Sequence, residues 1–341
     1  MKTLQLTKNG SPQEAFQLKE LPNPEPEAGE LLIRTECFGL NYADVMARNG
    51  LYNDAPPLPC TLGYEVVGEV EKTGKGVTQF AEGDRVLAFT RFGGYAEKSI
   101  ADERTVVKLP PQIPSDKAAA LATQYCTAYY AAIRMANIQK NERVLIHACA
   151  GGVGLALLDL AQYIGCETIG TAGSASKLEF ISLRGVNHAV NYREKDFASE
   201  IRKITGEQKP VDAAFDAVGG KTYVQTKKLM NYGGRHVLFG VASRKTKGPK
   251  LLNTLKLAWS FGLSHPLEFL LGSRGVIGLN MLRIAEEKPA VLGEVMENLI
   301  DLYQNGHLNP HVYKSYRFNE LSAAHEALEN RKTIGKLVVF W

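Results

Sequence analysis

The stretch Val144-Leu145-Ile146-His147-Ala148-Cys149-Ala150-Gly151-Gly152-Val153-Gly154 decides the fold of this chain. It joins a short apolar β-type run to a glycine cluster, and an apolar helical pattern follows from Leu155. A strand, a tight glycine turn and a helix together place a pyrophosphate at a helix N-terminus. Glycines permit the turn, let the backbone approach the phosphates and let the helix pack on the strand. The candidate residues for dinucleotide binding are Ala150, Gly151, Gly152, Val153 and Gly154. The alternative interpretation is a plain turn before a buried helix, with no ligand.

Strand and helix patterns alternate after this turn, which predicts βαβ units and a parallel sheet with helices on both faces. The carboxyl ends of such strands hold the ligand. Residues at these ends are therefore candidates for cofactor contacts: Tyr192, Val218, Gly240 and Val241. The predicted strands are 144–148, 167–172, 189–191, 211–216 and 234–240, the predicted helices are 155–164, 177–183, 197–205 and 221–230, and 276–282 is a candidate closing strand.

The end of the second strand indicates which nicotinamide cofactor binds. NAD-binding proteins carry an acidic residue there for the ribose 2′-hydroxyl. This chain has no acid at that point but has Ser174, Ser176 and Lys177, which can hydrogen-bond and neutralise a 2′-phosphate. The pattern favours NADPH, and a serine helix cap beside a solvated lysine is the alternative.

The first part of the chain is dense in short strands and glycine turns, which predicts a small β-barrel-like domain. A terminal strand needs a sheet edge to pair with, so we expect the strand 336–341 and the helix before it to return to this domain. The predicted domains are residues 1–122 completed by 283–341, and a nucleotide-binding domain over 123–282.

The composition is that of a globular protein of about two domains. Its 40 basic and 36 acidic residues give a net charge of +4, too small and too evenly spread to indicate nucleic-acid binding. Five scattered cysteines favour a reducing compartment and no structural zinc lobe. The N-terminus lacks a signal-peptide core, and no uncharged apolar run approaches the ~20 residues of a membrane span. We therefore expect a cytoplasmic protein.

Several motifs together resemble the zinc-free quinone oxidoreductase (zeta-crystallin-like) family of medium-chain dehydrogenase/reductases. The resemblance covers the whole chain. It implies a GroES-like catalytic domain, a Rossmann domain, NADPH in the cleft and a homodimer joined through Rossmann sheet edges. The residues that carry it are Gly39–Asp44, Arg48-x-Gly50-x-Tyr52, Gly63-Tyr64-Glu65, Gly83–Val86, Ala150–Gly154 and Gly335-Lys336.

The resemblance also assigns candidate site residues. Zinc-dependent relatives use a cysteine where this chain has Asn41 and a histidine where it has Tyr64, so no metal is expected. Asn41 is expected to donate a hydrogen bond beside the nicotinamide or the acceptor oxygen. Tyr52 is the candidate hydroxyl that orients or protonates the substrate, or else an aromatic wall of the pocket. Thr127, at the start of a helix, and Arg331 are candidate cofactor contacts, with a solvated arginine as the alternative for Arg331.

Four other polar residues are expected to be structural. Asp44 is interpreted as a brace for its loop and Glu65 as a structural carboxylate. His147, within the first Rossmann strand, is interpreted as a buried and satisfied histidine. Cys149 is interpreted as an inert small residue rather than an oxidisable one.

Segment 243–282 is the least typical part of the chain. It is basic over 244–250 and apolar over 251–271, and it resembles the branch of the vesicle amine transport protein-like membrane proteins. Three interpretations stay open: an amphipathic cover over the substrate cleft, a dimer contact, and contact of 244–271 with a membrane surface.

The combined features predict an NADPH-dependent oxidoreductase that transfers hydride, without metal, to a quinone or to an activated alkene (an enone or alkenal). An apolar small-molecule acceptor suits the aromatic residues near Tyr52. The alternative is a nucleotide-responsive binding protein of low turnover that associates with lipid or a membrane surface, because a fold of this type does not fix a reaction.

Overall fold

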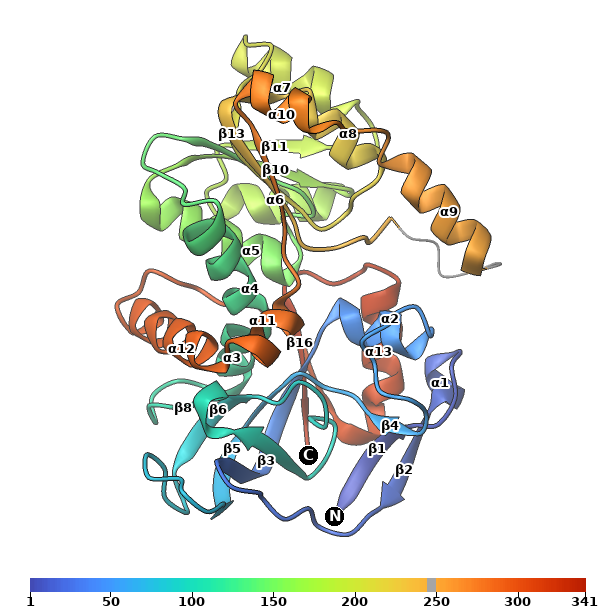
Figure 1. The fold of residues 1–341 in the computed structure, drawn as a ribbon, viewed down its shortest axis with the longest axis vertical. Helices are drawn as coiled ribbons and strands as arrows, with labels where there is room; N and C mark the ends of the chain where they lie inside the picture. The colour runs from blue at the N-terminus through green and yellow to red at the C-terminus, as the bar shows by residue number, and fades with distance from the viewer. Residues whose placement is uncertain (244–249) are drawn as a thin grey trace. The chain divides into compact units, whose positions relative to one another are not determined.

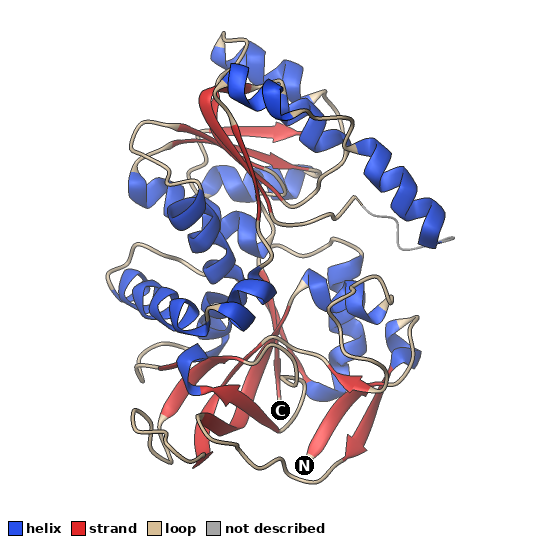
Figure 2. Cartoon of the chain, in the orientation of Figure 1, coloured by secondary structure: helices blue, strands red, loops and turns tan. Residues whose placement is uncertain are grey.

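The computed structural model describes residues 1–243 and 250–341, and the chain divides into two compact units (Figure 1). Unit 1 comprises Met1–Cys126, Met281–Gly306 and Pro310–Trp341, so both ends of the chain build it. Unit 2 comprises Thr127–Asn280 and His307–Asn309. Figure 2 shows the helices and strands of both units.

Unit 1 is built on a seven-stranded sheet in the order β15-β16-β3-β5-β6-β8, with β7 also paired to β3. The central strand β3 pairs antiparallel with β5 and with the terminal strand β16, where Val338 lies opposite Gly39. This pairing brings the C-terminal Lys336 to the end of β3. The strands are β3 (Glu30–Leu40), β5 (Glu65–Thr73), β6 (Arg85–Phe89), β7 (Lys98–Asp102), β8 (Val106–Lys108), β15 (Val312–Arg317) and β16 (Lys336–Phe340).

A second, three-stranded sheet in the order β2-β1-β4 and a set of α-helices complete unit 1. Its core is one apolar cluster that includes Phe38, Val66 and Leu337. The small sheet consists of β1 (Lys2–Leu6), β2 (Phe16–Glu20) and β4 (Cys60–Thr61), and the helices are α1 (Pro12–Ala15), α2 (Tyr42–Arg48), α3 (Ser115–Ala120), α11 (Met281–Glu287), α12 (Pro289–Gln304) and α13 (Leu321–Glu329).

Unit 2 is a six-stranded sheet in the order β11-β10-β9-β12-β13-β14, and every neighbouring pair is parallel. The predicted parallel sheet is therefore confirmed, and the candidate closing strand forms as β14 at one edge. The strands are β9 (Arg143–Ile146), β10 (Glu167–Ala172), β11 (His188–Asn191), β12 (Val211–Asp216), β13 (Met230–Leu238) and β14 (Gly275–Gly278).

Helices connect the strands of unit 2 as the alternating pattern predicts. They are α5 (Gly152–Ile164), α6 (Ala175–Leu183), α7 (Phe197–Thr205), α8 (Lys221–Lys227), α9 (Lys250–Ser260) and α10 (Pro266–Gly272). Among the described residues, none of the helices combines the length and the apolar character that crossing a membrane requires.

Several predicted boundaries were wrong. The strand predicted over 234–240 extends from Met230 to Leu238, and the candidate strand 276–282 ends at Gly278, because α11 begins at Met281. The helix predicted over 221–230 ends at Lys227, because Met230 already pairs with Val211 in the sheet. The first strand of unit 2 ends at Ile146, so His147 follows the strand instead of lying within it. Thr127 does not begin a helix, because an unbroken helical run that includes α4 (Cys126–Tyr129) extends from 115 to 135.

Candidate active site

The glycine turn forms the N-terminus of α5 in unit 2. Gly151 is the cap residue and offers no side chain to the first N–H groups of the helix, which lack intrahelical partners. A Cβ added at Gly154 would stand 2.5 Å from the carbonyl oxygen of Ala148 and 2.7 Å from Cα of Cys149. The turn and the helix thus approach so closely that only glycine fits at position 154. Backbone N–H groups and the helix dipole favour an anion at this point.

The end of β10 carries the predicted cofactor-selecting residues. Ser174 and Ser176 lie next to each other, with their hydroxyl oxygens 3.3 Å apart, and half-buried Lys177 follows in α6. A Cβ added at Gly173 would stand 2.6 Å from the hydroxyl oxygen of Tyr192 and 3.1 Å from Nε of Arg193. The structure therefore brings the Tyr192 hydroxyl beside the Ser174 turn and adds Arg193, which the sequence analysis did not identify. The predicted cofactor contact of Tyr192 stays a prediction.

The turn after β12 is held by a buried carboxylate. Oδ1 of Asp216 accepts hydrogen bonds from the backbone N–H groups of Val218 at 2.6 Å and Gly219 at 2.9 Å. Gly219 and Gly220 both have positive φ, at 70° and 62°. The neighbouring turn after β13 is close, because a Cβ at Gly240 would stand 2.8 Å from the Ala217 carbonyl oxygen. Val218, Gly240 and Val241 thus lie on adjacent turns at the carboxyl edge of the sheet.

His147 and Cys149 are structural, as predicted. Nδ1 of His147 lies 3.1 Å from the Thr171 hydroxyl and Nε2 lies 2.8 Å from the Thr226 hydroxyl, so both ring nitrogens have partners. Burial lowers the pKa of His147 to about 4. Burial also raises the pKa of the Cys149 thiol to about 12, so it remains a thiol near neutral pH.

A buried ion pair between Lys336 and Glu65 dominates the candidate site in unit 1. Both residues are 0% exposed, and Nζ of Lys336 contacts Oε1 of Glu65. Asn41, at the end of β3, lies between them: its Nδ2 is 2.9 Å from each carboxylate oxygen, and its Oδ1 is 3.0 Å from Nζ of Lys336. The hydroxyl of Thr123 donates to Oε2 of Glu65. Glu65 is thus structural, as predicted, and Lys336 and Thr123 are additional members of the cluster.

Asp44 braces the loop around Asn41. Its carboxylate accepts hydrogen bonds from the backbone N–H of Asn41 at 2.8 Å and of Gly63 at 3.3 Å, which confirms the predicted role. Complete burial raises the pKa of Asp44 to about 7, while the hydrogen bond from Asn41 acts in the opposite direction. The brace therefore titrates near neutral pH.

Tyr52 and Tyr64 form an aromatic pair, and Tyr64 directly precedes Glu65, the first residue of β5. Their rings meet edge to face, with centroids 6.5 Å apart and planes at 88°. Burial, reinforced by the charge of Asp54, raises the pKa of Tyr52. The half-buried Tyr52 therefore remains a protonated hydroxyl that can donate a hydrogen bond, and it also forms part of an aromatic wall.

The residues at the expected metal position do not suit zinc. A zinc site needs sulfur, nitrogen or oxygen ligands with free lone pairs. Here the Asn41 oxygen faces an ammonium, both Glu65 oxygens have donors, and burial raises the pKa of the Tyr64 phenol. A buried positive charge at this position opposes a second cation. Among the described residues, no group of three or more histidine, cysteine, aspartate or glutamate side chains is placed to hold a metal.

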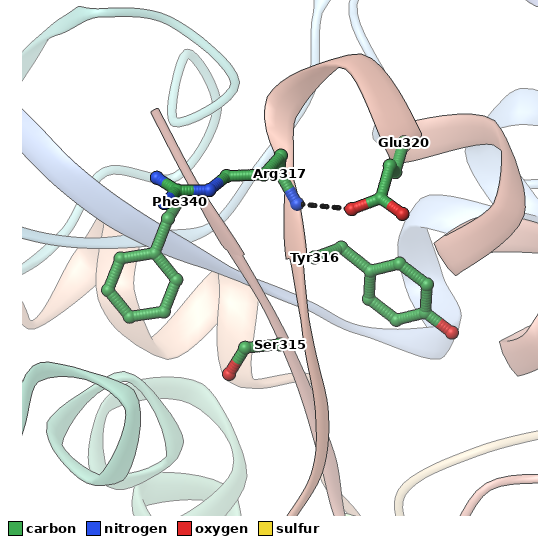
Figure 3. Close-up of a pocket in the computed structure, with 5 residues that line it drawn as sticks. All are labelled: Ser315, Tyr316, Arg317, Glu320 and Phe340. Atoms are coloured by element: carbon green, nitrogen blue, oxygen red, sulfur yellow. Dashed lines mark hydrogen bonds between the residues drawn. The ribbon is translucent and has the colours of Figure 1, made fainter.

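Thr127 and Arg331 are the remaining predicted cofactor contacts. Thr127 is buried within the long helical run, and Arg331 is exposed near the end of α13 with a positive φ of 54°. Their predicted contacts with the cofactor stay predictions. A hollow of about 350 Å³ in unit 1 contains none of the predicted site residues; it is lined by Ser315, Tyr316, Arg317, Glu320 and Phe340. Figure 3 shows these five side chains.

The architecture places the protein among the two-domain oxidoreductases that combine a GroES-like sheet domain with a parallel nucleotide-binding sheet. Residues 27–111 match the model of the alcohol dehydrogenase GroES-like domain, and residues 184–339 match that of the zinc-binding dehydrogenases. The chain is 34% identical to the human synaptic vesicle membrane protein VAT-1 homolog over 318 residues, which cover 93% of this chain and 80% of that protein.

Solved structures agree with this assignment. Escherichia coli quinone oxidoreductase complexed with NADPH is 29% identical, covers 100% of both chains and has a TM-score of 0.87. The CurK enoyl reductase is 28% identical, covers 99% of this chain and 98% of its own, and has a TM-score of 0.83. The chain therefore belongs to the medium-chain dehydrogenase/reductase family, close to the VAT-1 homologs and the quinone oxidoreductases.

Proposed function

We propose that this protein is an NADPH-dependent oxidoreductase that transfers hydride, without a metal ion, to a quinone or to an activated alkene such as an enone or alkenal. The observation that carries the proposal is the end of β10, where Gly173 leaves room for the Tyr192 hydroxyl and Arg193 beside the Ser174 turn. A phenol, serine hydroxyls and cations in place of an acid suit a ribose 2′-phosphate.

The residues of unit 2 fit this cofactor. The open N–H groups at the start of α5 suit the pyrophosphate, and Ser174, Lys177 and Tyr192 suit the 2′-phosphate. When bound, NADPH supplies the hydride from its reduced nicotinamide. The NADPH complex of the E. coli quinone oxidoreductase, at 29% identity, supports this assignment.

The residues of unit 1 supply positioning and hydrogen bonds for the acceptor. Asn41 offers an amide N–H to an acceptor oxygen, and Tyr52 offers a hydroxyl that stays protonated. Such donors stabilise the negative charge that develops on oxygen as hydride arrives. Quinones and enones both have a carbonyl oxygen conjugated to the position that accepts the hydride, so negative charge develops on that oxygen. The two structural neighbours are named for a quinone and an enoyl substrate.

Turnover with a set of acceptors tests the proposal. We expect the purified protein to oxidise NADPH in the presence of at least one quinone or enone, and Asn41→Ala to lower kcat by roughly 100-fold, the usual effect of removing one such donor. Tyr52→Phe separates the two roles of Tyr52, because it keeps the ring and removes the hydroxyl. Tight NADPH binding without turnover of any quinone or enone would contradict the enzymatic proposal.

We also propose a homodimer joined through β14. This strand is one of the two edges of the unit 2 sheet, and its sequence Gly-Val-Ile-Gly contains neither the charged residues nor the prolines that protect an open edge. Val276 on this edge is 37% exposed. Light scattering of the parent and of Val276→Lys tests the proposal, since a charge at the edge should yield monomers.

A second candidate function is binding to a lipid or membrane surface, as in the name of the VAT-1 homolog. Residues 244–249 of the segment in question lie outside the described residues. In the described part, α9 and α10 and the turn between them expose large apolar side chains: Leu255, Trp259, Leu263, Leu267, Leu270 and Leu271. Sedimentation with anionic liposomes, for the parent and a Trp259→Ser/Leu263→Ser variant, tests this function independently of turnover.

The cysteines support a reducing compartment such as the cytoplasm. All five are unpaired and buried: Cys37, Cys60, Cys126, Cys149 and Cys166.

A further inference from the structure

We propose that Lys336 is a positioning residue that, together with Glu65, fixes the orientation of the Asn41 side-chain amide. The inference rests on the proposed function for the step in which Asn41 donates to the acceptor oxygen. Lys336 is the first residue of β16, and its side chain has no exposure to solvent. A lysine is rarely buried to this extent unless its charge is paired.

The donor and acceptor properties of the two charged groups permit one amide orientation. An ammonium has only donors, so it must face Oδ1 of Asn41, which lies 3.0 Å away. An ionised carboxylate has only acceptors, so it must face Nδ2, which lies 2.9 Å from both carboxylate oxygens. Turning the amide by 180° would place a donor against Lys336 and an acceptor against Glu65. The pair therefore selects the observed orientation.

The contact with Glu65 leaves one amide N–H for another acceptor. The two oxygens of a carboxylate lie close together, so a single N–H that is shared between them accounts for both equal distances. The second N–H of Nδ2 diverges from the first and is not required by Glu65. If the amide rotated by 180°, Oδ1 would take the place of Nδ2 and its second N–H. An oxygen there would repel a developing oxyanion.

The surrounding backbone is shaped to hold the ion pair. A side chain at Gly39 would overlap with Oε1 of Glu65 and with Cε of Lys336. Thr123 holds the second carboxylate oxygen, so Glu65 cannot rotate freely. The cluster thus fixes Glu65 from two sides, and Glu65 in turn fixes Asn41.

A pair that serves stability alone would behave differently from a pair that also orients Asn41. Removing one charge leaves the other buried and unpaired, which destabilises strongly, whereas replacing both by neutral groups restores much of the stability. The double variant Lys336→Met/Glu65→Gln therefore separates the two roles. It has no unpaired charge, but the amide introduced at position 65 can either donate to or accept from the Asn41 amide, so the orientation of Asn41 is no longer fixed.

The test compares Lys336→Met, Glu65→Gln and their double variant with the parent in the full-length protein. Thermal unfolding reports stability, and steady-state kinetics with NADPH and the best acceptor report kcat and KM. Spectra of protein labelled with ¹⁵N-asparagine report the Asn41 amide directly, with its signal assigned by its loss in Asn41→Ser. The control is Arg184→Met/Asp159→Asn, which removes a buried ion pair of unit 2 that does not contact Asn41.

We expect the double variant to unfold at a higher temperature than either single variant and yet to keep a kcat about 10- to 100-fold below the parent, with KM for NADPH unchanged. Its Asn41 amide signals should shift or broaden, and the control should change neither kcat nor these signals. Parental kcat or unchanged Asn41 signals in the double variant would overturn the inference. If the parent reduces no acceptor, the proposed function fails, while the amide signals still decide whether Lys336 and Glu65 orient Asn41.

Discussion

The hydroxyl of Tyr192 lies against Gly173, in the space that a side chain at position 173 would occupy. Gly173 directly follows β10, the second strand of the parallel sheet along the chain. The contact therefore brings a phenol, and with it Arg193, to the turn where dinucleotide-binding proteins select between the 2′-hydroxyl and the 2′-phosphate.

A methyl group at position 173 should disturb this selection. In Gly173→Ala the added Cβ would stand 2.6 Å from the Tyr192 hydroxyl oxygen, so the ring must move away. We expect the affinity for NADPH to fall by roughly 3- to 10-fold, about the value of one hydrogen bond, and that for NADH to change less. Fluorescence titration measures both. Gly275→Ala, at the amino end of β14, where the methyl meets no atom within 4 Å, is the control; equal losses for both cofactors would contradict a role in phosphate selection.

Asp44 should make stability depend on pH. Its pKa is raised from 3.8 to about 7 in the folded protein, so the folded state binds the proton more tightly than the unfolded state. Its contribution is complete below pH 4 and is lost as pH rises from about 4 through 7, by at most about 4 kcal/mol. Urea unfolding at several pH values should show the loss in the parent relative to Asp44→Asn. A difference between the two proteins that stays constant across this range would contradict the assignment.

His147 should make stability depend on pH in the opposite direction to Asp44. Its pKa is lowered from 6.5 to about 4 by burial, so the unfolded state binds the proton more tightly. The stability it contributes is complete above pH 6.5 and is lost as pH falls through about 4, by roughly 3 kcal/mol. NMR titration of the His147 ring should give a midpoint near pH 4. A midpoint above pH 6 would mean that the ring is not buried as described.

The five thiols should be unreactive in the folded protein. All are buried, and burial raises the pKa of Cys149 to about 12 and of Cys166 to about 11. An aromatic disulfide reagent at pH 7.5 should label few thiols before unfolding and five after it. Fast modification of Cys149 in the native protein would show that the turn is open or that the thiol is activated.

Most helices and strands of unit 2 could be predicted from local sequence patterns. Apolar runs, glycine turns and helical periodicity each act within a few residues, and they predicted the strand β10 (Glu167–Ala172) and the helix α7 (Phe197–Thr205) with their observed ends. The error at Met230 arose from a competing tertiary interaction, because sheet pairing ended a helical pattern. Thr127 was misplaced because two helical patterns joined without a break.

The long-range partners could not be predicted from local pattern. Lys336 and Glu65 are 271 residues apart, and the antiparallel pairing of β3 with both β16 and β5 brings them together. A lysine at the start of an apolar strand was the one signal of a buried charge, but it did not identify the partner. Arg193 was missed because it lies on the turn after β11, one strand away from Gly173.

Titration of the parent and of Lys177→Ala with NADPH and NADH shows whether a phosphorylated nicotinamide nucleotide binds to unit 2. We expect the parent to bind NADPH roughly tenfold or more tightly than NADH, since a charged hydrogen bond to phosphate contributes about 1.5 kcal/mol or more. Lys177→Ala should lose much of this preference with little change for NADH. Equal affinity of the parent for both cofactors, or binding of neither, would contradict a 2′-phosphate site at the end of β10.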